Sequence, residues 1–537
     1  MAATHTIFGR QYPASYDAIV VGAGIGGLFC ANLLAKGGMK VLLLEKHSVL
    51  GGFCSGFRRK GFLFDAATHF YPLLGNPTTL SGRLLKDLQV ETEWIKMDPV
   101  DQFHIPGMKT FTVPAEFGPY IERLKEWFPE EAPNVDKYFQ ELKKAHMYGL
   151  LYYFRGVAND QMEKFEKHTI ASKLDEHFKD ARLKTILMGD APHWGSSPNK
   201  TSYVFDAMLR LSYFLGNYYP KGSSQQFAND LGSALERQGG KVLKCAGVEK
   251  ILVDGDKCAG VRVATASKRA PEHFTFHAPV VVSNADAIHT YRDLLGEENG
   301  GGWMTDHLKS LKTSYPCFLM HIGVQGMDPD KLAHSEGYYW KRCDPSDIIP
   351  NVFKIFVPTR FDPDIAPPGC QIIITQRPSP YMAGDDIDWA AHKADLQAKT
   401  LARVREEHPD IDDHVVTISS ATAMTSQRFT GNWQGGMLGW EMSPDQLGPS
   451  RLPIYTPIDN LYLTGHWTQP GGGITPVIVS AQRVAKAILT GHEEDARELS
   501  GYYFRFNRPS VTPAEADLGS AAESLSNDAF FRSEQTK

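Results

Sequence analysis

Cysteine is scarce in this chain, and the cysteines that occur are widely spaced. There are 7 of them in 537 residues, an odd number, and no two form a Cys-x-x-Cys pair. A disulfide framework or a structural zinc site needs a regular pattern of cysteines, so the sequence argues against both. The histidines are scattered without metal-ligand spacing. We therefore expect no metal site and a reducing compartment.

A strong charge of either sign is also missing. Lys and Arg total 56 and Asp and Glu total 62, which gives a formal net charge of −6. Binding to nucleic acid phosphates requires a strongly basic field, so we expect no nucleic-acid partner. A hydrophobic content of 42% over this length excludes a disordered chain and permits more than one domain.

Long apolar runs are absent as well. Residues 1–15 contain no apolar segment typical of a secretory signal, and we expect them to form a loose leader. Residues 18–35 and 461–482 carry no formal charge, but glycines or prolines interrupt both. Membrane-spanning helices need a nearly continuous apolar run. The sequence thus predicts neither secretion nor a transmembrane helix.

The first clear motif is a strand–helix–strand unit near the N-terminus. Apolar runs at 17–21 and 41–44 flank a helical pattern over 25–36. A G-x-G-x-x-G sequence joins the first strand to the helix, and this pattern allows a tight turn, approach of the backbone to a pyrophosphate and close helix–strand packing. Glu45 ends the second strand, where a carboxylate can accept ribose hydroxyls. The predicted dinucleotide-binding residues here are Gly22, Ala23, Gly24, Ile25, Gly26, Gly27, Glu45 and Lys46.

The residue composition changes several times along the sequence, and these changes predict two discontinuous domains. Apolar, glycine-rich segments at 16–90, 219–302 and 454–496 are assigned to the nucleotide-binding domain. Segments 91–218 and 303–453 are assigned to a second, substrate-binding and membrane-contacting domain inserted in two pieces. Residues 497–537 are rich in Ser, Ala and Glu and are interpreted as a tail.

Three further motifs follow the first in order. A Gly51-Gly52 doublet comes shortly after Glu45, although a plain turn would also explain it. The sequence VVVSNAD at 280–286 follows a run of short predicted strands. The sequence NLYLTGH at 460–466 precedes PGGGITP at 470–476 and a predicted helix.

These motifs together resemble FAD enzymes of the GR2 type, and in particular the carotenoid desaturase/isomerase family, which includes retinol saturases. The resemblance implies an α/β fold, with a GR2-type FAD-binding Rossmann-like domain and an inserted α+β substrate domain. It implies non-covalent FAD, with contacts from Gly51, Gly52, Val248, Asn284, Ala285, Gly465, His466, Gly473, Ile474 and Thr475. Two departures stand out: the usual basic residue beside the Gly-Gly doublet is absent, and His466 replaces a common acidic residue.

The same resemblance implies redox chemistry on a carotenoid or related isoprenoid polyene. Desaturation, saturation and cis–trans isomerisation all remain open, as does the electron acceptor. A water-insoluble substrate implies a peripheral membrane protein, on the cytoplasmic side or in an organelle stroma. The aromatic stretches 148–155 and 209–219 suit an apolar tunnel or an interfacial helix, but an ordinary helical core explains each equally well.

His69 is the candidate catalytic residue. Retinol saturases carry a histidine at the matching place, and an imidazole near the flavin could donate or accept a proton. The alternative is a packed structural histidine.

Two other functions are compatible with parts of the sequence. A flavin amine or amino-acid oxidase would need an aromatic cage, to which Trp467 and Tyr455 could contribute. A non-enzymatic prenyl-binding escort, as in the related Rab GDP-dissociation-inhibitor family, would not need redox chemistry. The intact glycines and Glu45 argue against the escort.

Overall fold

The computed structural model describes residues 3–491, apart from 152–159, 267–269, 300, 345, 347 and 383–386. The predicted tail at 497–537 lies outside the described residues, as does the second half of the aromatic stretch 148–155. Within the described part of the chain, no helix combines the length and the apolar character needed to cross a membrane.

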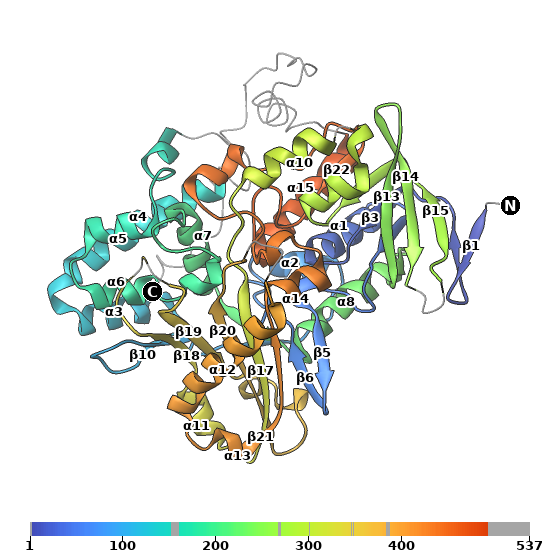
Figure 1. The fold of residues 1–537 in the computed structure, drawn as a ribbon. Helices are drawn as coiled ribbons and strands as arrows, with labels where there is room; N and C mark the ends of the chain where they lie inside the picture. The colour runs from blue at the N-terminus through green and yellow to red at the C-terminus, as the bar shows by residue number, and fades with distance from the viewer. Residues whose placement is uncertain are drawn as a thin grey trace.

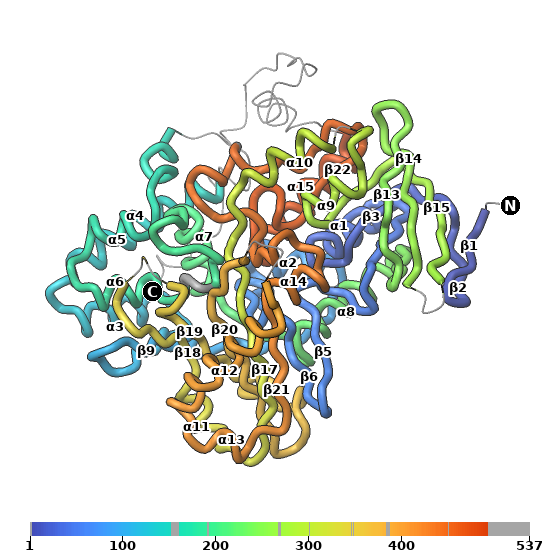
Figure 2. The backbone as a smooth tube through the Cα atoms, viewed as in Figure 1, coloured from blue at the N-terminus to red at the C-terminus, as the bar shows by residue number. Residues whose placement is uncertain are grey.

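A five-stranded parallel sheet forms the centre of the nucleotide-binding half (Figure 1). Its strand order is β12-β4-β3-β16-β22, and every neighbouring pair is parallel. Figure 2 shows that early, middle and late parts of the chain meet here. The strand bounds, in that order, are Lys241–Leu243, Val41–Leu44, Ala18–Val21, Val280–Ser283 and Leu461–Leu463.

Different layers cover the two faces of this sheet. Alternate side chains such as Val20 and Leu43 pack in one core with helices α1 (Ile25–Lys36), α8 (Ser223–Arg237) and α15 (Ile474–Thr490). The intervening side chains, such as Ile19 and Leu42, pack in a second core. Burial on both faces explains why these strands are continuous apolar runs rather than alternating ones.

The second face is covered by an antiparallel sheet of β13 (Ala246–Asp254), β14 (Lys257–Thr265) and β15 (His273–His277). A hairpin of β1 (Thr4–Ile7) and β2 (Arg10–Pro13) precedes the first parallel strand. The expectation of a loose leader was therefore wrong. Ile7 and Tyr12 are buried in the second core, and the Tyr16 N–H donates to the His277 carbonyl at 2.9 Å, so this short polar segment is anchored.

A seven-stranded mixed sheet forms the other half of the molecule, in the order β10-β9-β18-β19-β20-β17-β21. Only the β9–β18 pair among these is parallel. The bounds, in that order, are Phe111–Val113, Asp101–His104, Gly337–Trp340, Val352–Phe356, Cys370–Pro378, Cys317–Gln325 and Val415–Ala421. Helix α12 (Trp389–Glu407) packs on one face, against the core that contains Phe318.

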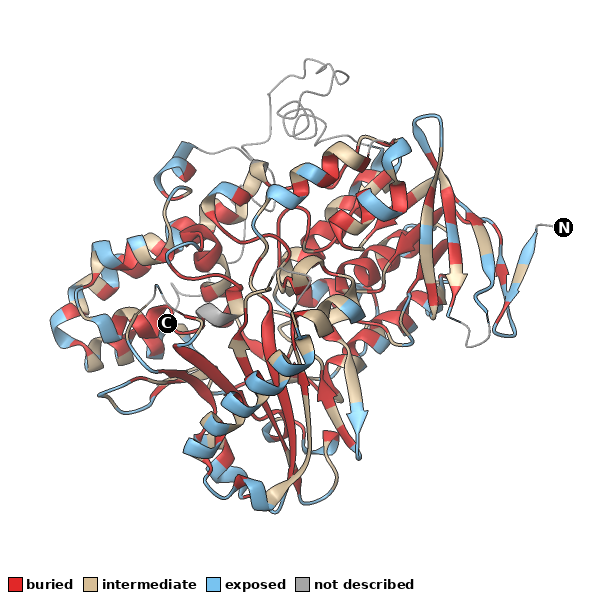
Figure 3. Cartoon of the chain, in the orientation of Figure 1, coloured by how far each residue is buried: buried red, intermediate tan, exposed pale blue. Residues whose placement is uncertain are grey.

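The opposite face of β17 to β20 meets the hairpin of β5 (Gly56–Arg59) and β6 (Phe62–Asp65). A helical layer joins β9, β10 and β18 in the largest buried core, and its helices combine buried red residues with exposed pale-blue ones in Figure 3. Its helices are α3 (Phe117–Trp127), α4 (Ala132–Gly149), α5 (Ile170–His177), α6 (Ala181–Leu187) and α7 (Tyr203–Tyr213).

Shorter elements connect the two halves. A small sheet has the order β7-β11-β8, with bounds Tyr71–Pro72, Asn217–Pro220 and Trp94–Lys96. The remaining α-helices are α2 (Leu80–Asp87), α9 (Ala287–His289), α10 (Gly301–Ser310), α11 (Pro329–His334), α13 (Ile411–His414) and α14 (Ala423–Thr430). The three segments assigned to the nucleotide-binding domain all contribute to the parallel sheet, and the exact domain boundaries stay predictions.

Candidate functional site

One large cavity of about 1970 Å³ begins at the carboxyl ends of the parallel strands and extends into the helical layer. Ligands of open α/β sheets bind at this edge of the sheet. Small-molecule pockets typically measure roughly 300–1000 Å³, so the cavity has room for a dinucleotide and a second large ligand. Gly22, Glu45 and Gly465 line its near end, and Phe205 and Met208 line an apolar arm.

The glycine-rich turn lies in the wall of the near end. Gly22 has a φ of +92°, which side-chain-bearing residues rarely adopt. Gly24 is the N-cap of α1, where no side chain caps the helix and the first turn has no acidic residue. The free N–H groups and the helix dipole therefore leave a place for an anion such as a pyrophosphate.

The Gly51-Gly52 doublet packs against this turn. The Gly51 N–H donates to the Ala23 carbonyl at 2.8 Å, and φ is +113° at Gly51 and +59° at Gly52. A Cβ on Gly52 would lie 3.3 Å from the Cα of Gly24. Both glycines of the doublet line the cavity, so the backbone of the doublet and the backbone of the glycine turn approach each other closely at the cavity wall.

Glu45 is buried at the cavity wall and already holds two backbone groups. One carboxylate oxygen accepts from the Ala23 N–H and the other from the His47 N–H, each at 2.8 Å. A carboxylate offers about four lone-pair positions, so two remain for ribose hydroxyls. The side chain thus also fixes the glycine turn, which the motif alone did not indicate. Its neighbour Lys46 lines the cavity too, and burial lowers the pKa of that ammonium, although Glu45 and Asp286 oppose the shift.

The Asn284 side chain lies over the glycine turn, and three glycines make room for it. A Cβ at Gly24, Gly26 or Gly465 would lie 2.9, 2.6 or 2.6 Å from the nearest atom of its amide. Asn284 and Ala285 line the cavity, as does Val248 on β13. The motifs at 22–27, 280–286 and 460–466 therefore meet at one place.

A second helix begins at the cavity. Gly473, with a φ of +107°, is the N-cap of α15, and the helix has neither a side-chain cap nor an acidic residue in its first turn. Ile474 and Thr475 line the cavity at this end. The free N–H groups of α15 can stabilise negative charge there.

His466 is neutral in this environment. Burial, aided by the Arg451 cation, lowers the pKa of His466 to about 3. Its Nε2 atom lies 3.2 Å from Oδ1 of Asn432, and the same oxygen accepts from the Trp467 indole at 3.0 Å. His466 therefore does not reproduce the charge of the acidic residue common at this position in the resembled family, although it lines the cavity.

His69 is 3% exposed and is one of the residues that line the cavity. Its Nδ1 atom lies 3.0 Å from the Ala67 carbonyl, which can only accept, so Nδ1 carries the proton. The Nε2 lone pair is buried without a partner. Burial and the Lys354 cation lower the pKa of His69 to about 3. The Nε2 atom has almost no accessible surface, so the imidazole would have to shift to accept a hydrogen bond from a bound molecule, and it is poorly suited to supply a proton.

All the predicted site residues line the cavity except Ala23 and Gly27, which lie behind the turn. Their individual roles stay predictions. The candidate amine cage is different: among the residues described, neither Trp467 nor Tyr455 lines the cavity. Trp467 packs against Trp440 with ring centroids 4.6 Å apart, and Tyr455 packs against Tyr462.

Sequence reasoning missed several polar residues of the cavity. His193, His321 and Gln376 line it from the second half of the molecule. His321 and Gln376 lie on strands β17 and β20, within strongly apolar runs, and His193 follows α6. No local motif marks them, because only the tertiary fold brings them to the cavity.

One group of potential metal ligands occurs elsewhere among the described residues, at Glu141, Glu176 and His177. The Lys173 ammonium lies 2.5 Å from a Glu141 oxygen and 2.6 Å from a Glu176 oxygen. This lysine already forms ion pairs with both carboxylates, so the group is an ion-pair cluster on the helical layer.

The near end of the cavity suits FAD. It offers a glycine turn for close approach, a carboxylate at the ribose position and two uncapped helix N-termini for negative charge. A Cβ at Gly24 or Gly26 would clash with the Asn284 side chain, which packs on the glycine turn.

Comparisons with known proteins agree with this geometry. The family described as flavin containing amine oxidoreductase matches residues 25–489. All-trans-retinol 13,14-reductase of Homo sapiens is 26% identical, over 85% of this chain and 83% of that protein. Lycopene-forming phytoene desaturase of a Paracoccus species is 26% identical over 89% and 98%, respectively. Chloroplastic prolycopene isomerase 2 of an Oncidium hybrid cultivar is 28% identical over 91% and 87%.

A solved structure shares the fold. The crystal structure of an oxidoreductase from Methanosarcina mazei superposes with a TM-score of 0.62 at 18% identity, covering 87% of this chain and 99% of that one. The α/β architecture expected from the sequence is thereby confirmed.

Proposed function

The chain belongs to the flavin-containing amine oxidoreductase family and is an FAD-dependent oxidoreductase, and from this premise we propose that its substrate is a carotenoid or related isoprenoid polyene. The names of three relatives support the proposal, since they act on retinol, phytoene and prolycopene. Desaturation, saturation and cis–trans isomerisation are all represented among those names.

The continuity of the large cavity is the observation that carries this proposal. The same cavity is lined by the glycine turn at one end and by Met147, Leu150, Met208 and Phe214 at the other. An elongated apolar molecule in this arm would lie end-on to the cofactor site. A small polar amine would leave most of the arm unfilled.

Bound FAD would exchange a hydride or electrons with the conjugated chain of the substrate. The groups proposed to hold it are the Glu45 carboxylate at the ribose, the N-terminus of α1 at the pyrophosphate and the N-terminus of α15 at the electron-rich end of the flavin. The apolar arm excludes water and fixes which bond faces the cofactor. His69 offers its free Nε2 lone pair to the reacting region.

We also propose that the substrate enters from a membrane surface without a membrane span. Leu80 is 66% exposed yet lines the cavity, and so marks an opening of it, whereas Phe429, which is 51% exposed, lines the nucleotide end beside His47. The cationic side chains of Arg83 and Lys143 line the same cavity. Exposed apolar residues among basic ones suit an anionic lipid surface.

Product analysis tests the proposed function. The protein is expressed in cells that make different carotene intermediates, and a parallel sample receives retinol. Chromatography should show conversion of at least one polyene, and denaturation of the purified protein should release FAD. Peroxide formation with amines and no polyene conversion would favour the amine oxidase alternative. Purified protein without flavin would favour the escort.

A further inference from the structure

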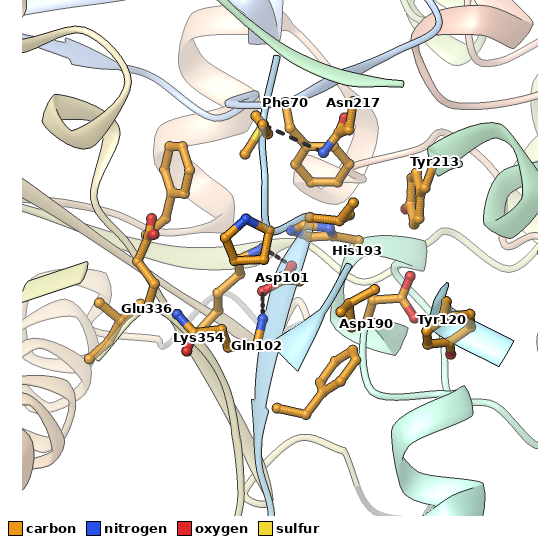
Figure 4. A pocket seen from close by; sticks show the side chains of 18 of the residues that line it. Phe70, Asp101, Gln102, Tyr120, Asp190, His193, Tyr213, Asn217, Glu336 and Lys354 are labelled. Atoms are coloured by element: carbon orange, nitrogen blue, oxygen red, sulfur yellow. Dashed lines mark hydrogen bonds and ion pairs between the residues drawn. The ribbon is translucent and has the colours of Figure 1, made fainter. Parts of the chain in front are cut away.

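Figure 4 shows the lining of a second, smaller pocket, and part of this lining is shared with the large cavity. Phe70, His193, Tyr213 and Phe214 line both spaces. The small pocket measures about 40 Å³, enough for roughly two or three water molecules. Apolar side chains such as Val100 and Ile355 form much of its lining, and six charged residues also line it: Asp101, Asp190, Arg210, Glu336, Lys354 and Arg360.

A chain of hydrogen bonds links two of these charged residues to the shared part of the lining. The Lys354 Nζ atom lies 2.8 Å from an Asp101 carboxylate oxygen and 3.3 Å from the Tyr338 hydroxyl. The Tyr338 hydroxyl lies 2.8 Å from Nδ1 of His193. On the other side of the ring, Nε2 of His193 lies 3.2 Å from Oε1 of Gln376.

The partners fix the direction of every donor in this chain. The Gln376 carbonyl oxygen can only accept, so His193 carries its proton on Nε2 and has a lone pair on Nδ1. Tyr338 must therefore donate to Nδ1, and its oxygen accepts from the Lys354 ammonium. The donors all point from the small pocket toward the large cavity.

The residues of this hydrogen-bond chain are buried from solvent, except at Asp101, where the chain ends. Tyr338 is fully buried and the Lys354 side chain is 5% exposed, whereas the Asp101 side chain is 17% exposed. Burial lowers the pKa of His193 well below its usual value, and the Lys354 cation adds to the effect. The ring is therefore neutral at rest, with one proton on the side of the large cavity.

His69 cannot substitute for His193 as a proton donor. The two rings are neighbours, with centroids 5.7 Å apart. The Nδ1 proton of His69 is held by the Ala67 carbonyl, and its Nε2 atom carries only a lone pair. His193 is the one of the pair that has a connected supply of protons.

We propose that Lys354, Tyr338 and His193 form a proton route between the small pocket and the large cavity; this rests on the proposed polyene chemistry. Saturation of a double bond takes a hydride from the cofactor at one carbon and a proton at the other. His193 releases its Nε2 proton from Gln376 to that second carbon, Tyr338 passes its hydroxyl proton to Nδ1, and Lys354 replaces the proton on the Tyr338 oxygen. The ring then holds its proton on Nδ1, and that proton has to return to Nε2 before the next turnover.

The neutral Lys354 amine then regains a proton from water in the small pocket, beside Asp101. One proton crosses per turnover, and no electrons move along the route. Desaturation starts from the other neutral tautomer of His193, with its proton on Nδ1. The substrate carbon then loses its proton to the free Nε2 after the hydride has left, the Nδ1 proton passes to Tyr338, the Tyr338 hydroxyl proton passes to a neutral Lys354 amine, and a proton leaves toward Asp101. His193 is the catalytic residue here, and Tyr338 and Lys354 act through it.

Tyr338→Phe is the test variant, because it removes the connecting hydroxyl and keeps the ring. Tyr339→Phe is a matched control on the same strand, β18. Tyr339 is also buried, but it lies in the core on the other face of the sheet, and its hydroxyl donates to the Ser335 carbonyl at 2.8 Å. Both variants lose one buried tyrosine hydroxyl, and only the first interrupts the route.

Flavin content, melting temperature, kcat, KM and the solvent deuterium isotope effect are measured on the flavin-loaded enzymes with the converted polyene. We expect Tyr338→Phe to lower kcat about 10- to 100-fold, with KM and flavin content unchanged, and to raise the isotope effect because proton transfer becomes rate-limiting. Tyr339→Phe should keep the wild-type kcat and isotope effect.

If Tyr338→Phe binds flavin and matches Tyr339→Phe in rate and isotope effect, the proton route is wrong. Should Tyr338→Phe fail to fold, His193→Gln replaces it, since the amide preserves polar contacts but cannot relay a proton. Its rate and isotope effect are then compared with those of Tyr339→Phe, and equal values would again contradict the route. Absence of any polyene conversion by the wild-type enzyme would instead overturn the proposed function, and the route with it.

Discussion

A Cβ atom added to Gly27 would lie only 2.0 Å from the carbonyl oxygen of Gly22. The first turn of α1 therefore rests directly on the backbone that leaves strand β3. The last glycine of the motif serves packing between helix and strand rather than contact with the cavity, which it does not line. Any side chain there would push the helix N-terminus away from the sheet.

Gly27→Ala should lower both stability and flavin content. Overpacking of this kind costs about 1–3 kcal/mol, and the displaced helix N-terminus would lose its place at the pyrophosphate. Thermal melting and flavin absorbance of the purified protein measure the two effects. Gly118→Ala is the control, because a Cβ there meets no atom within 4 Å. Full flavin content and an unchanged melting temperature in Gly27→Ala would contradict this account.

Glu45→Gln should weaken FAD binding and also loosen the turn. The amide has one acceptor oxygen, so either the Ala23 or the His47 N–H loses its partner, and hydrogen bonds to a charged group contribute about 1.5–3 kcal/mol. Equilibrium titration with FAD and chemical unfolding of the apoprotein separate the two effects. Asp17→Asn is the matched control, since Asp17 accepts from the Lys40 N–H beside the same sheet but does not line the cavity. Equal FAD affinity in Glu45→Gln and wild type would remove Glu45 from the cofactor site.

His69→Ala should slow turnover while FAD stays bound. The change removes the unpartnered Nε2 lone pair from the reacting region and leaves the glycine turn and both helix N-termini intact. It also removes the stacking on Phe356, whose ring centroid lies 4.5 Å away, so some loss of stability is expected. Turnover, flavin content and melting temperature are measured together. A variant that is only less stable, with normal turnover per flavin, would make His69 a structural residue.

His321→Gln should flatten the dependence of stability on pH. Burial lowers the pKa of His321 to about 4, below the 6.5 of an unfolded histidine. The unfolded state therefore binds a proton first as the pH falls below 6.5, and the folded state loses stability until the pH reaches about 4. At pH 5 this contribution is about 2 kcal/mol relative to pH 7.5. Denaturant unfolding of wild type and variant at both pH values gives the difference, and parallel pH dependences would contradict it.

Leu80→Asp should reduce binding to vesicles that contain anionic lipid. The residue is exposed at the cavity opening beside a basic side chain, and a carboxylate there opposes insertion and repels the lipid headgroups. Vesicle flotation measures the bound fraction, and a high-salt wash should release the wild-type protein. Phe8→Asp is the control, because Phe8 is 59% exposed but does not line the cavity. Equal losses in the two variants would show that Leu80 has no special place in the contact.

The nucleotide-binding part was predictable because its signals are local. The helix predicted at 25–36 coincides with α1, and the strand at 41–44 coincides with β4. In this part of the chain, the residues that make the turn, fill the core and approach the cofactor follow one another closely in sequence, so a short motif reveals them.

The polar side of the substrate region was not predictable for the opposite reason. Tyr338 and His193 are 145 residues apart in sequence, and Lys354 and Asp101 are 253 apart. Each lies in a segment whose pattern indicates only a strand or a helix end. Tertiary packing alone gives these side chains their partners, so a single sequence contains no local trace of the network. The hairpin at residues 4–13 was missed because its two anchoring side chains are surrounded by polar residues.

The order of the parallel sheet has a consequence for synthesis of the protein. Strand β16 lies between β3, near the start of the chain, and β22, near its end. A ribosome-bound chain that has already made the glycine turn still lacks β22, Gly465 and the N-terminus of α15. The cofactor site is therefore completed only after β22 and α15 have been synthesised, and we expect flavin to bind late in synthesis or after it. Chains truncated before β22 would keep the dinucleotide motif and remain colourless.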